Sequence, residues 1–257
     1  MIEIFWAELR RQWIQQRRFA IDSIAGILGI AVAFYGFFLT TQYAAGPAAQ
    51  FGDRLDAIVV GYTLWSLVTF IIADIAGGLQ QEAFTGTLEQ IFLSPFSPAQ
   101  IFLTRAVARL TITLTQICGI LLILMAVTGR MLSFSPLLLF PLITVILGAF
   151  GIALIMGSLS LLIKQVQQIL GFLPFGLFLA MLVPVETWGI PARWLGWLLP
   201  MTPGAGVLRD LMARSQGLNW GNLAIAFLNG GIYFAIGLAL FKQAERIAKQ
   251  RGRLGGY

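Results

Sequence analysis

The chain has 257 residues, of which 58% are hydrophobic and only 11% are charged, and its net charge is +6. Soluble domains carry about 45–50% apolar and about 25% charged residues, so this composition excludes water as the solvent for most of the chain. The absence of histidine and the single cysteine, Cys118, exclude an internal disulfide and disfavour zinc or haem sites. In a membrane protein, an excess of lysine and arginine points to topology and lipid headgroups, and not to nucleic acid.

The first predicted element in the chain is an amphipathic helix over residues 1–18. Its apolar residues share one helical stripe, and its charged and amide residues mostly avoid that stripe. Two tryptophans on the apolar face, with arginines nearby, are typical of a helix that lies in the membrane interface. The stripe consists of Ile2, Phe5, Trp6, Leu9 and Trp13.

Six apolar runs then reach the roughly 20 residues that a membrane-spanning helix needs. The first run is too long for the core of a signal peptide, which has about 7–15 residues, so we expect it to be a retained span. The whole chain, 1–257, is therefore predicted to be one all-α integral membrane domain. The six runs lie near 19–41, 57–79, 105–128, 137–162, 168–187 and 221–241.

The distribution of positive charge predicts the orientation of the spans. With both termini inside, the inner segments hold twelve of the seventeen lysines and arginines, and the outer segments hold five. Because positive residues favour the cytoplasmic side, we expect both termini in the cytoplasm, together with a basic tail over residues 242–257.

Small residues recur every four positions in two of the spans, a spacing that lets helix backbones approach closely. We expect them to pack helices within one subunit, with a subunit interface as the alternative. They are Ala25, Gly29 and Ala33 in the first span, and Ala149, Ala153 and Gly157 in the fourth.

The segment between spans two and three, "QQEAFTGTLEQIFLSPFSPAQ", is the longest stretch that is not mainly apolar. Its apolar residues fall on one face of a helix over 82–93, and Glu82 and Glu89 share another face. Pro95 stops this helix, and Ser97 caps the next one. The periodicity alone fits a docking helix or an ordinary interfacial helix equally well.

Three charged residues lie near the inner mouth of spans two and three. Arg105 and Arg109 are four residues apart at the start of span three, and Asp74 lies near the end of span two. We expect these side chains either to reach the headgroups or to form ion pairs there.

Residues 188–218, between spans five and six, are too rich in proline and glycine to form one helix. We expect short helices that enter the outer leaflet and return. Such a segment survives in a membrane only when it is buried in protein or lines a cavity. Pro200, Pro203 and Gly204 are candidates for an outer gate, and a lid that braces the spans is the alternative.

Three stretches resemble bacterial ABC type 2 transporter permeases, the membrane subunits of ABC exporters. They are "GTLEQIFLSPFSPAQIFLTRAVA", "LPMTPGAGVLRDLM" and the basic ending "AERIAKQRGRLGGY". The order of elements is also similar: an interfacial helix, two spans, a polar segment, four spans and a tail. The resemblance covers essentially the whole chain.

The resemblance implies a mechanism and a set of partners. Two permease subunits, identical or closely related, form the translocation path in the bacterial inner membrane, in contact with membrane lipids. Two cytoplasmic ABC ATPase subunits bind ATP and magnesium, and the permease itself binds no cofactor or metal. The segment after span two would act as the coupling helix, and the residues carried over as ATPase contacts are Glu82, Gly86, Thr87, Leu88 and Glu89.

The chain offers no ATP chemistry of its own. A phosphate-binding loop ends in Gly-Lys-Ser/Thr, and none of the three lysines follows a glycine. We therefore expect a separate ATPase polypeptide and no enzymatic activity in this chain. The alternatives are a haem-export or cytochrome-assembly permease, an ATP-independent carrier and an intramembrane enzyme. The chain has neither a histidine nor a G-x-S-x-G turn, which counts against the intramembrane enzyme.

Overall fold

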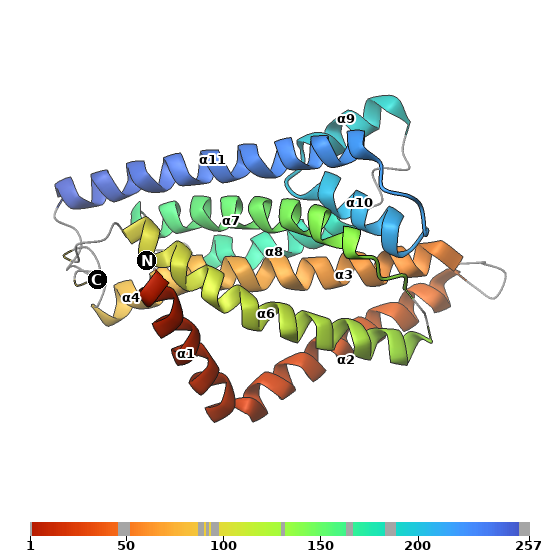
Figure 1. Cartoon of the computed structure of the whole chain (residues 1–257), viewed down its shortest axis with the longest axis horizontal. Coiled ribbons are helices and arrows are strands. Elements are labelled where there is room, and N and C mark those ends of the chain that lie inside the picture. The colour runs from red at the N-terminus through yellow and green to blue at the C-terminus, as the bar shows by residue number, and fades with distance from the viewer. Residues whose placement is uncertain are drawn as a thin grey trace.

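The structure, a computed structural model, describes residues 2–45, 52–86, 90, 93, 98–129, 132–162, 167–182 and 189–251. Within these residues all regular structure is helical (Figure 1). The elements are α1 (Ile2–Arg18), α2 (Ala20–Ala45), α3 (Gly52–Ile72), η1 (Ala73–Gly77), α4 (Gly78–Thr85), α6 (Pro98–Thr128), η2 (Pro136–Leu138), α7 (Leu139–Leu162), α8 (Gln167–Leu182), α9 (Ile190–Leu198), α10 (Thr202–Met212) and α11 (Trp220–Arg251).

Among the residues that the structure describes, five helical stretches are long and apolar enough to cross a membrane, so the chain is a multi-pass membrane protein. The fifth predicted span, 168–187, overlaps α8, whose 16 residues fall short of that length. Residues 183–187 of that span lie outside the described residues, and the count of six spans stays a prediction. The five stretches are Ser23–Thr40, Asp56–Glu82, Gln100–Thr128, Pro136–Leu162 and Trp220–Gln250.

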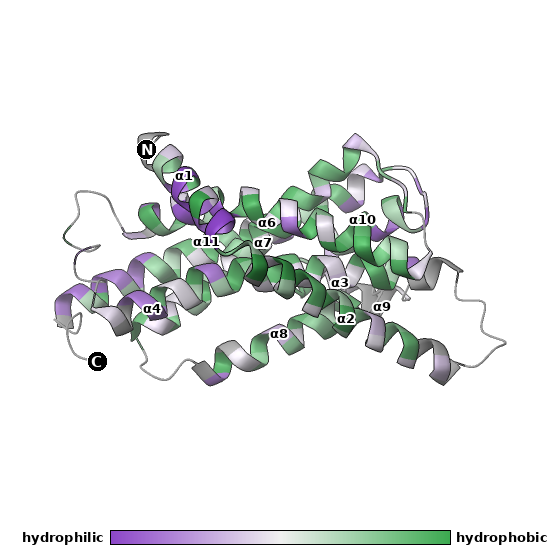
Figure 2. Cartoon of the chain, turned by 90° about the horizontal axis from the view of Figure 1, so that it is seen from below, coloured by the Kyte–Doolittle hydropathy of each residue, from purple (hydrophilic) through white to green (hydrophobic). Residues whose placement is uncertain are grey.

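The long helices run alternately up and down one bundle, so that α1 begins and α11 ends at the same end of it (Figure 1). The helix α4 and the start of α6 also lie there. Hydrophilic residues gather on α1, on α4 and on the last turns of α11, whereas the middle of the bundle is hydrophobic (Figure 2). We call this end the polar end. The short helices α9 and α10 lie at the opposite end.

The closest helix packing in the bundle is between α7 and α11. A Cβ atom added to Gly237 would lie 2.3 Å from the carbonyl oxygen of Gly151, and one added to Gly230 would lie 2.5 Å from the carbonyl oxygen of Thr144. Only glycine has no Cβ, so these positions let the two backbones touch.

The two predicted stripes of small residues behave differently. Ala149 and Ala153 of α7 are fully buried, as expected for packing within the subunit. Ala25, Gly29 and Ala33 of α2 are exposed instead, so the prediction that they pack within the subunit is wrong. The sequence spacing is the same in both helices, but α7 lies inside the bundle and α2 lies at its edge (Figure 1).

Span two is one continuous helical path with a widened turn in it. The π-helical segment η1 joins α3 to α4, and the amide of Gly78 donates to the carbonyl oxygens of Asp74 and Ile75. A π turn inserts one extra residue into an α-helix and frequently marks a functional site. Here it contains Asp74.

Candidate functional site

At the polar end, two ion pairs join the end of span two to the start of α6. The Arg109 Nε atom lies 3.0 Å from Oδ1 of Asp74, and the Arg105 Nη1 atom lies 2.9 Å from Oε1 of Glu82. The two arginines are one helical turn apart on α6, and the two acids are eight residues apart on the path from η1 to α4. Both ion pairs therefore span the same helix interface and hold it at two levels.

The predicted interfacial helix, α1, adds polar groups to this cluster. Its Glu8 side chain is buried, accepts a hydrogen bond from Gln12 (3.3 Å) and pairs with Arg11 (3.4 Å). Trp6 and Trp13 are 63% and 56% exposed on the other side of the helix. The helix thus turns its polar side toward α6 and its tryptophans away from the bundle, which is the arrangement that an interfacial helix requires.

The burial of Glu8 and Gln12 could not be predicted from their pattern. They lie four residues apart, so they share a face, but that face has the composition of a solvated surface. In the structure Glu8 and Asp74 line the same small cavity, beside Arg11 and Arg105, so the polar side of α1 meets polar residues of span two and α6 there.

The predicted coupling helix over 82–93 is wrong at its start. Glu82 to Thr85 form the last turn of α4, and Gly86 has a φ of +72°. A positive φ is incompatible with a right-handed helix, so the helix ends there. Glycine adopts this conformation readily because it has no Cβ atom. Thr87, Leu88 and Glu89 lie outside the described residues, so their predicted contacts stay predictions.

At the opposite end, the candidate gate residues belong to a hydrogen-bonded corner. Pro200 precedes α10, Pro203 lies in its first turn, and Gly204 is buried where a Cβ atom would lie 2.4 Å from Thr144 Oγ1. Asn229 of α11 accepts a hydrogen bond from the amide of Met201 and donates to the carbonyl oxygens of Trp197 and Leu199. This amide ties the link between α9 and α10 to α11. The role of the corner as a gate stays a prediction.

The complete burial of Arg209 could not be predicted from the sequence. This residue lies in α10, has an exposed fraction of 0%, and donates a hydrogen bond from Nη1 to the carbonyl oxygen of Met181 in α8. Sequence reasoning counted it among the positive charges of the outer segments. Its burial follows from the packing of α10 against α3, α7 and α11, which no local pattern shows.

Comparison with protein-family models matches residues 21–239 to the family described as ABC-2 family transporter protein. The matched range begins in α2 and ends in α11, and it includes both ion pairs of the polar end. No curated protein matches the chain.

Proposed function

Because the chain belongs to the ABC-2 transporter family and is thus the membrane permease subunit of an ABC transporter, we propose that it is an exporter driven by ATP. In this proposal the chain is not an enzyme. Two separate ATPase subunits bind ATP and magnesium and hydrolyse the nucleotide. Two permease chains, identical or closely related, form the path for the cargo.

The ion pair between Glu82 and Arg105 is the observation that carries the proposal. The helix α4 ends at Thr85, and α6 begins at Pro98. We call the residues between them, 86–97, the α4–α6 linker; Glu82 and Arg105 flank this linker and contact each other at 2.9 Å. The ion pair couples the two helices, so in the proposal a displacement of the linker is passed to both spans.

The polar end is the place where this proposal puts the ATPase. The start of α1, the end of α11 and the ends of α4 and α6 that flank residues 87–97 all lie at this end of the bundle (Figure 1). In the proposal this end faces the cytoplasm of a bacterial inner membrane, and the distribution of positive charge supports that orientation. The proposal keeps six spans, with α8 as part of the fifth. Gly86, Thr87, Leu88 and Glu89 then contact the ATPase, and Glu89 pairs with a basic side chain on it.

Reversal of the charge at Glu89 is expected to detach the ATPase. The full chain carries an affinity tag and is purified from its native membranes in mild detergent, and the associated proteins are identified by mass spectrometry. An ABC ATPase is expected with the wild type and is expected to fall at least tenfold with Glu89→Lys, because two positive charges then face each other.

The matched control is Gln90→Lys, which adds a positive charge one residue further on, at an exposed position. It is expected to retain the ATPase. If no ATPase accompanies the wild type even after crosslinking, an ATP-independent carrier becomes the better description. Equal losses with both variants would mean that the charge of Glu89 has no specific partner.

A further inference from the structure

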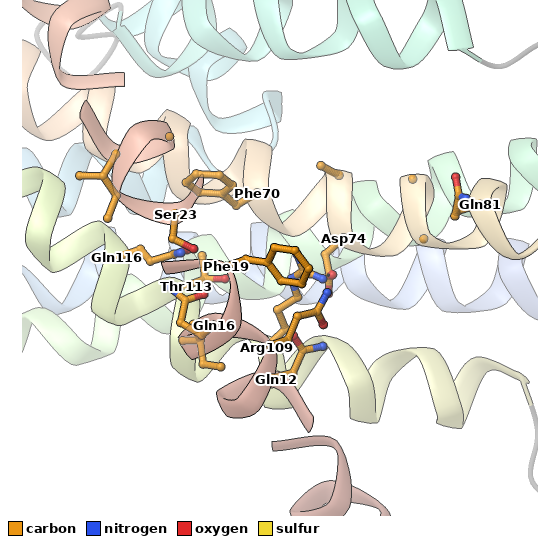
Figure 3. Close-up of a pocket in the computed structure, with 17 residues that line it drawn as sticks. Gln12, Gln16, Phe19, Ser23, Phe70, Asp74, Gln81, Arg109, Thr113 and Gln116 are labelled. Atoms are coloured by element: carbon orange, nitrogen blue, oxygen red, sulfur yellow. Dashed lines mark ion pairs between the residues drawn. The ribbon is translucent and has the colours of Figure 1, made fainter. Parts of the chain in front are cut away.

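A cavity of about 510 Å³ opens at the polar end, between the junction of α1 with α2, the η1 and α4 segments of span two, and α6. Ser23, Gln16, Thr113 and Gln116 lie together on one side of it, and Asp74 and Arg109 lie on the other (Figure 3). The ring of Phe19 lies between the two groups in this view. Its volume is within the range of pockets that hold small ligands.

The lining of the cavity is unusually rich in amide side chains. A primary amide offers two donors and one acceptor oxygen, so it can serve a hydroxyl group in either direction. Gln12 donates to Glu8, whereas the other amides have no side-chain hydrogen-bond partner within the described part of the chain. The five amides belong to Gln12, Gln15, Gln16, Gln81 and Gln116.

Among the described residues that line the cavity, the charges cancel. Asp74 and Arg109 are the charged ones in that set, and they pair with each other at 3.0 Å. A phosphate or carboxylate entering the cavity would have to break this pair or face the carboxylate of Asp74. An ammonium group would meet Arg109 in the same way. The electrostatics therefore select an uncharged ligand.

We propose that this cavity binds an uncharged polyhydroxyl group, such as a sugar, through the unpartnered amides of α1, α4 and α6. Phe19 and Phe70 also line it and offer apolar surface to the carbon face of such a group. Ile24 and Leu28 of α2 are exposed, and each follows a residue that lines the cavity, Ser23 and Ile27. A lipid-linked sugar can therefore place its headgroup in the cavity and its chains along α2.

The cavity and its chemistry stand apart from the proposed export function. Only the side of the membrane on which the cavity lies, the cytoplasmic side, rests on that proposal. Asp74 and Arg109 line both this cavity and the smaller one that contains Glu82 and Arg105. A ligand in the larger cavity would thus lie beside the Asp74–Arg109 ion pair, which separates it from the Glu82–Arg105 pair that flanks the α4–α6 linker.

The test is a binding titration of the full chain in phosphatidylcholine nanodiscs, read by native mass spectrometry. The protein is extracted with a copolymer, because alkyl maltoside detergents carry a competing sugar. The probes are glucosyl diacylglycerol, phosphatidic acid with the same acyl chains, and free methyl glucoside. Glucosyl diacylglycerol is expected to bind at least tenfold more tightly than phosphatidic acid.

Two cavity variants and two controls locate the binding. Gln116→Leu and Thr113→Val are each expected to weaken binding about five- to tenfold, as the loss of one hydrogen bond predicts. Thr115→Val, exposed two positions further along α6, and Gln216→Leu, exposed in the segment before α11, are expected to change it less than twofold. A photoreactive form of the glycolipid is expected to crosslink to α1, α2 or α6 of the wild type.

The outcomes distinguish a soluble sugar from a lipid headgroup as the ligand, and they test the sugar site independently of the proposed export function. Competition by methyl glucoside assigns a soluble sugar, and binding of the glycolipid alone assigns a lipid headgroup. Phosphatidic acid binding as tightly as the glycolipid, or cavity variants that bind like the wild type, would overturn the site. A wild-type chain that binds the glycolipid but copurifies with no ATPase would overturn only the proposed function.

Discussion

Gly237→Ala is expected to lower the melting temperature of the detergent-solubilised chain by roughly 6–12 °C, or to prevent its recovery as a monodisperse protein. The added Cβ atom would meet backbone atoms of Gly151 at 2.3–3.0 Å, and backbone cannot rotate away as a side chain can. The helices α7 and α11 would have to separate along their whole contact. We expect a cost of about 3 kcal/mol or more, the upper part of the range for overpacking.

The control lies in the same helix. Gly231 has nothing within 4 Å of its added Cβ atom, so Gly231→Ala changes only the helix propensity of α11. Alanine is favoured over glycine in a helix by about 1 kcal/mol, and this variant should be as stable as the wild type or slightly more so. Equal melting temperatures for the two variants would contradict the close α7–α11 contact.

Arg209→Met is the second substitution for which we expect a large loss of stability. It keeps the apolar length of the side chain but removes the fully buried guanidinium that donates to the carbonyl oxygen of Met181. A buried acceptor left without its donor costs about 1–3 kcal/mol, and hydrogen bonds to charged groups lie in the upper part of that range. The melting temperature should fall by roughly 4–10 °C.

Two further variants separate charge from geometry. Arg209→Lys keeps the positive charge but loses the planar fork of donors, so its stability should lie between those of the wild type and Arg209→Met. Arg246→Met removes an exposed arginine from α11 and should leave the melting temperature nearly unchanged. A wild-type melting temperature for Arg209→Met would show that α10 does not depend on this contact with α8.

The spans of the chain were largely predictable, because an apolar run of about 20 residues leaves the backbone few choices in lipid. The run over 105–128 corresponds to α6, and that over 221–241 lies within α11. Both helices extend well past the apolar runs at the polar end: α6 begins seven residues earlier, at Pro98, and α11 continues through the charged residues 242–251. Apolar content indicates where lipid ends, and not where the helix ends.

Features that depend on the neighbours of a helix could not be predicted. The small residues of α2 and of α7 have the same spacing, but only the latter face another helix of the subunit. The π turn that holds Asp74 had no signal in the sequence beyond the pair Gly77-Gly78 at its end. The end of α4 at Gly86 follows from a left-handed φ, whereas the apolar periodicity of 82–93 runs through this residue without interruption.

The candidate site shows the same division. The charge pattern placed Asp74, Arg105 and Arg109 near the mouth of spans two and three, with contact to headgroups and ion pairing as the alternatives. The structure joins Arg109 to Asp74, and it joins Arg105 to Glu82, a residue that had been assigned to the ATPase contact. The choice depends on the rotation of η1 and α4 relative to α6, which tertiary packing sets.

The most direct measurement is a charge exchange between Glu82 and Arg105 in the complex with its copurified ATPase. The rate of ATP hydrolysis in nanodiscs is compared for the wild type, Glu82→Arg, Arg105→Glu and the double variant. If the Glu82–Arg105 ion pair transmits motion to the spans, each single variant will hydrolyse ATP at least fivefold more slowly than the wild type. The double variant will recover a rate within twofold of the wild type. Single variants that hydrolyse ATP at the wild-type rate would contradict this transmission.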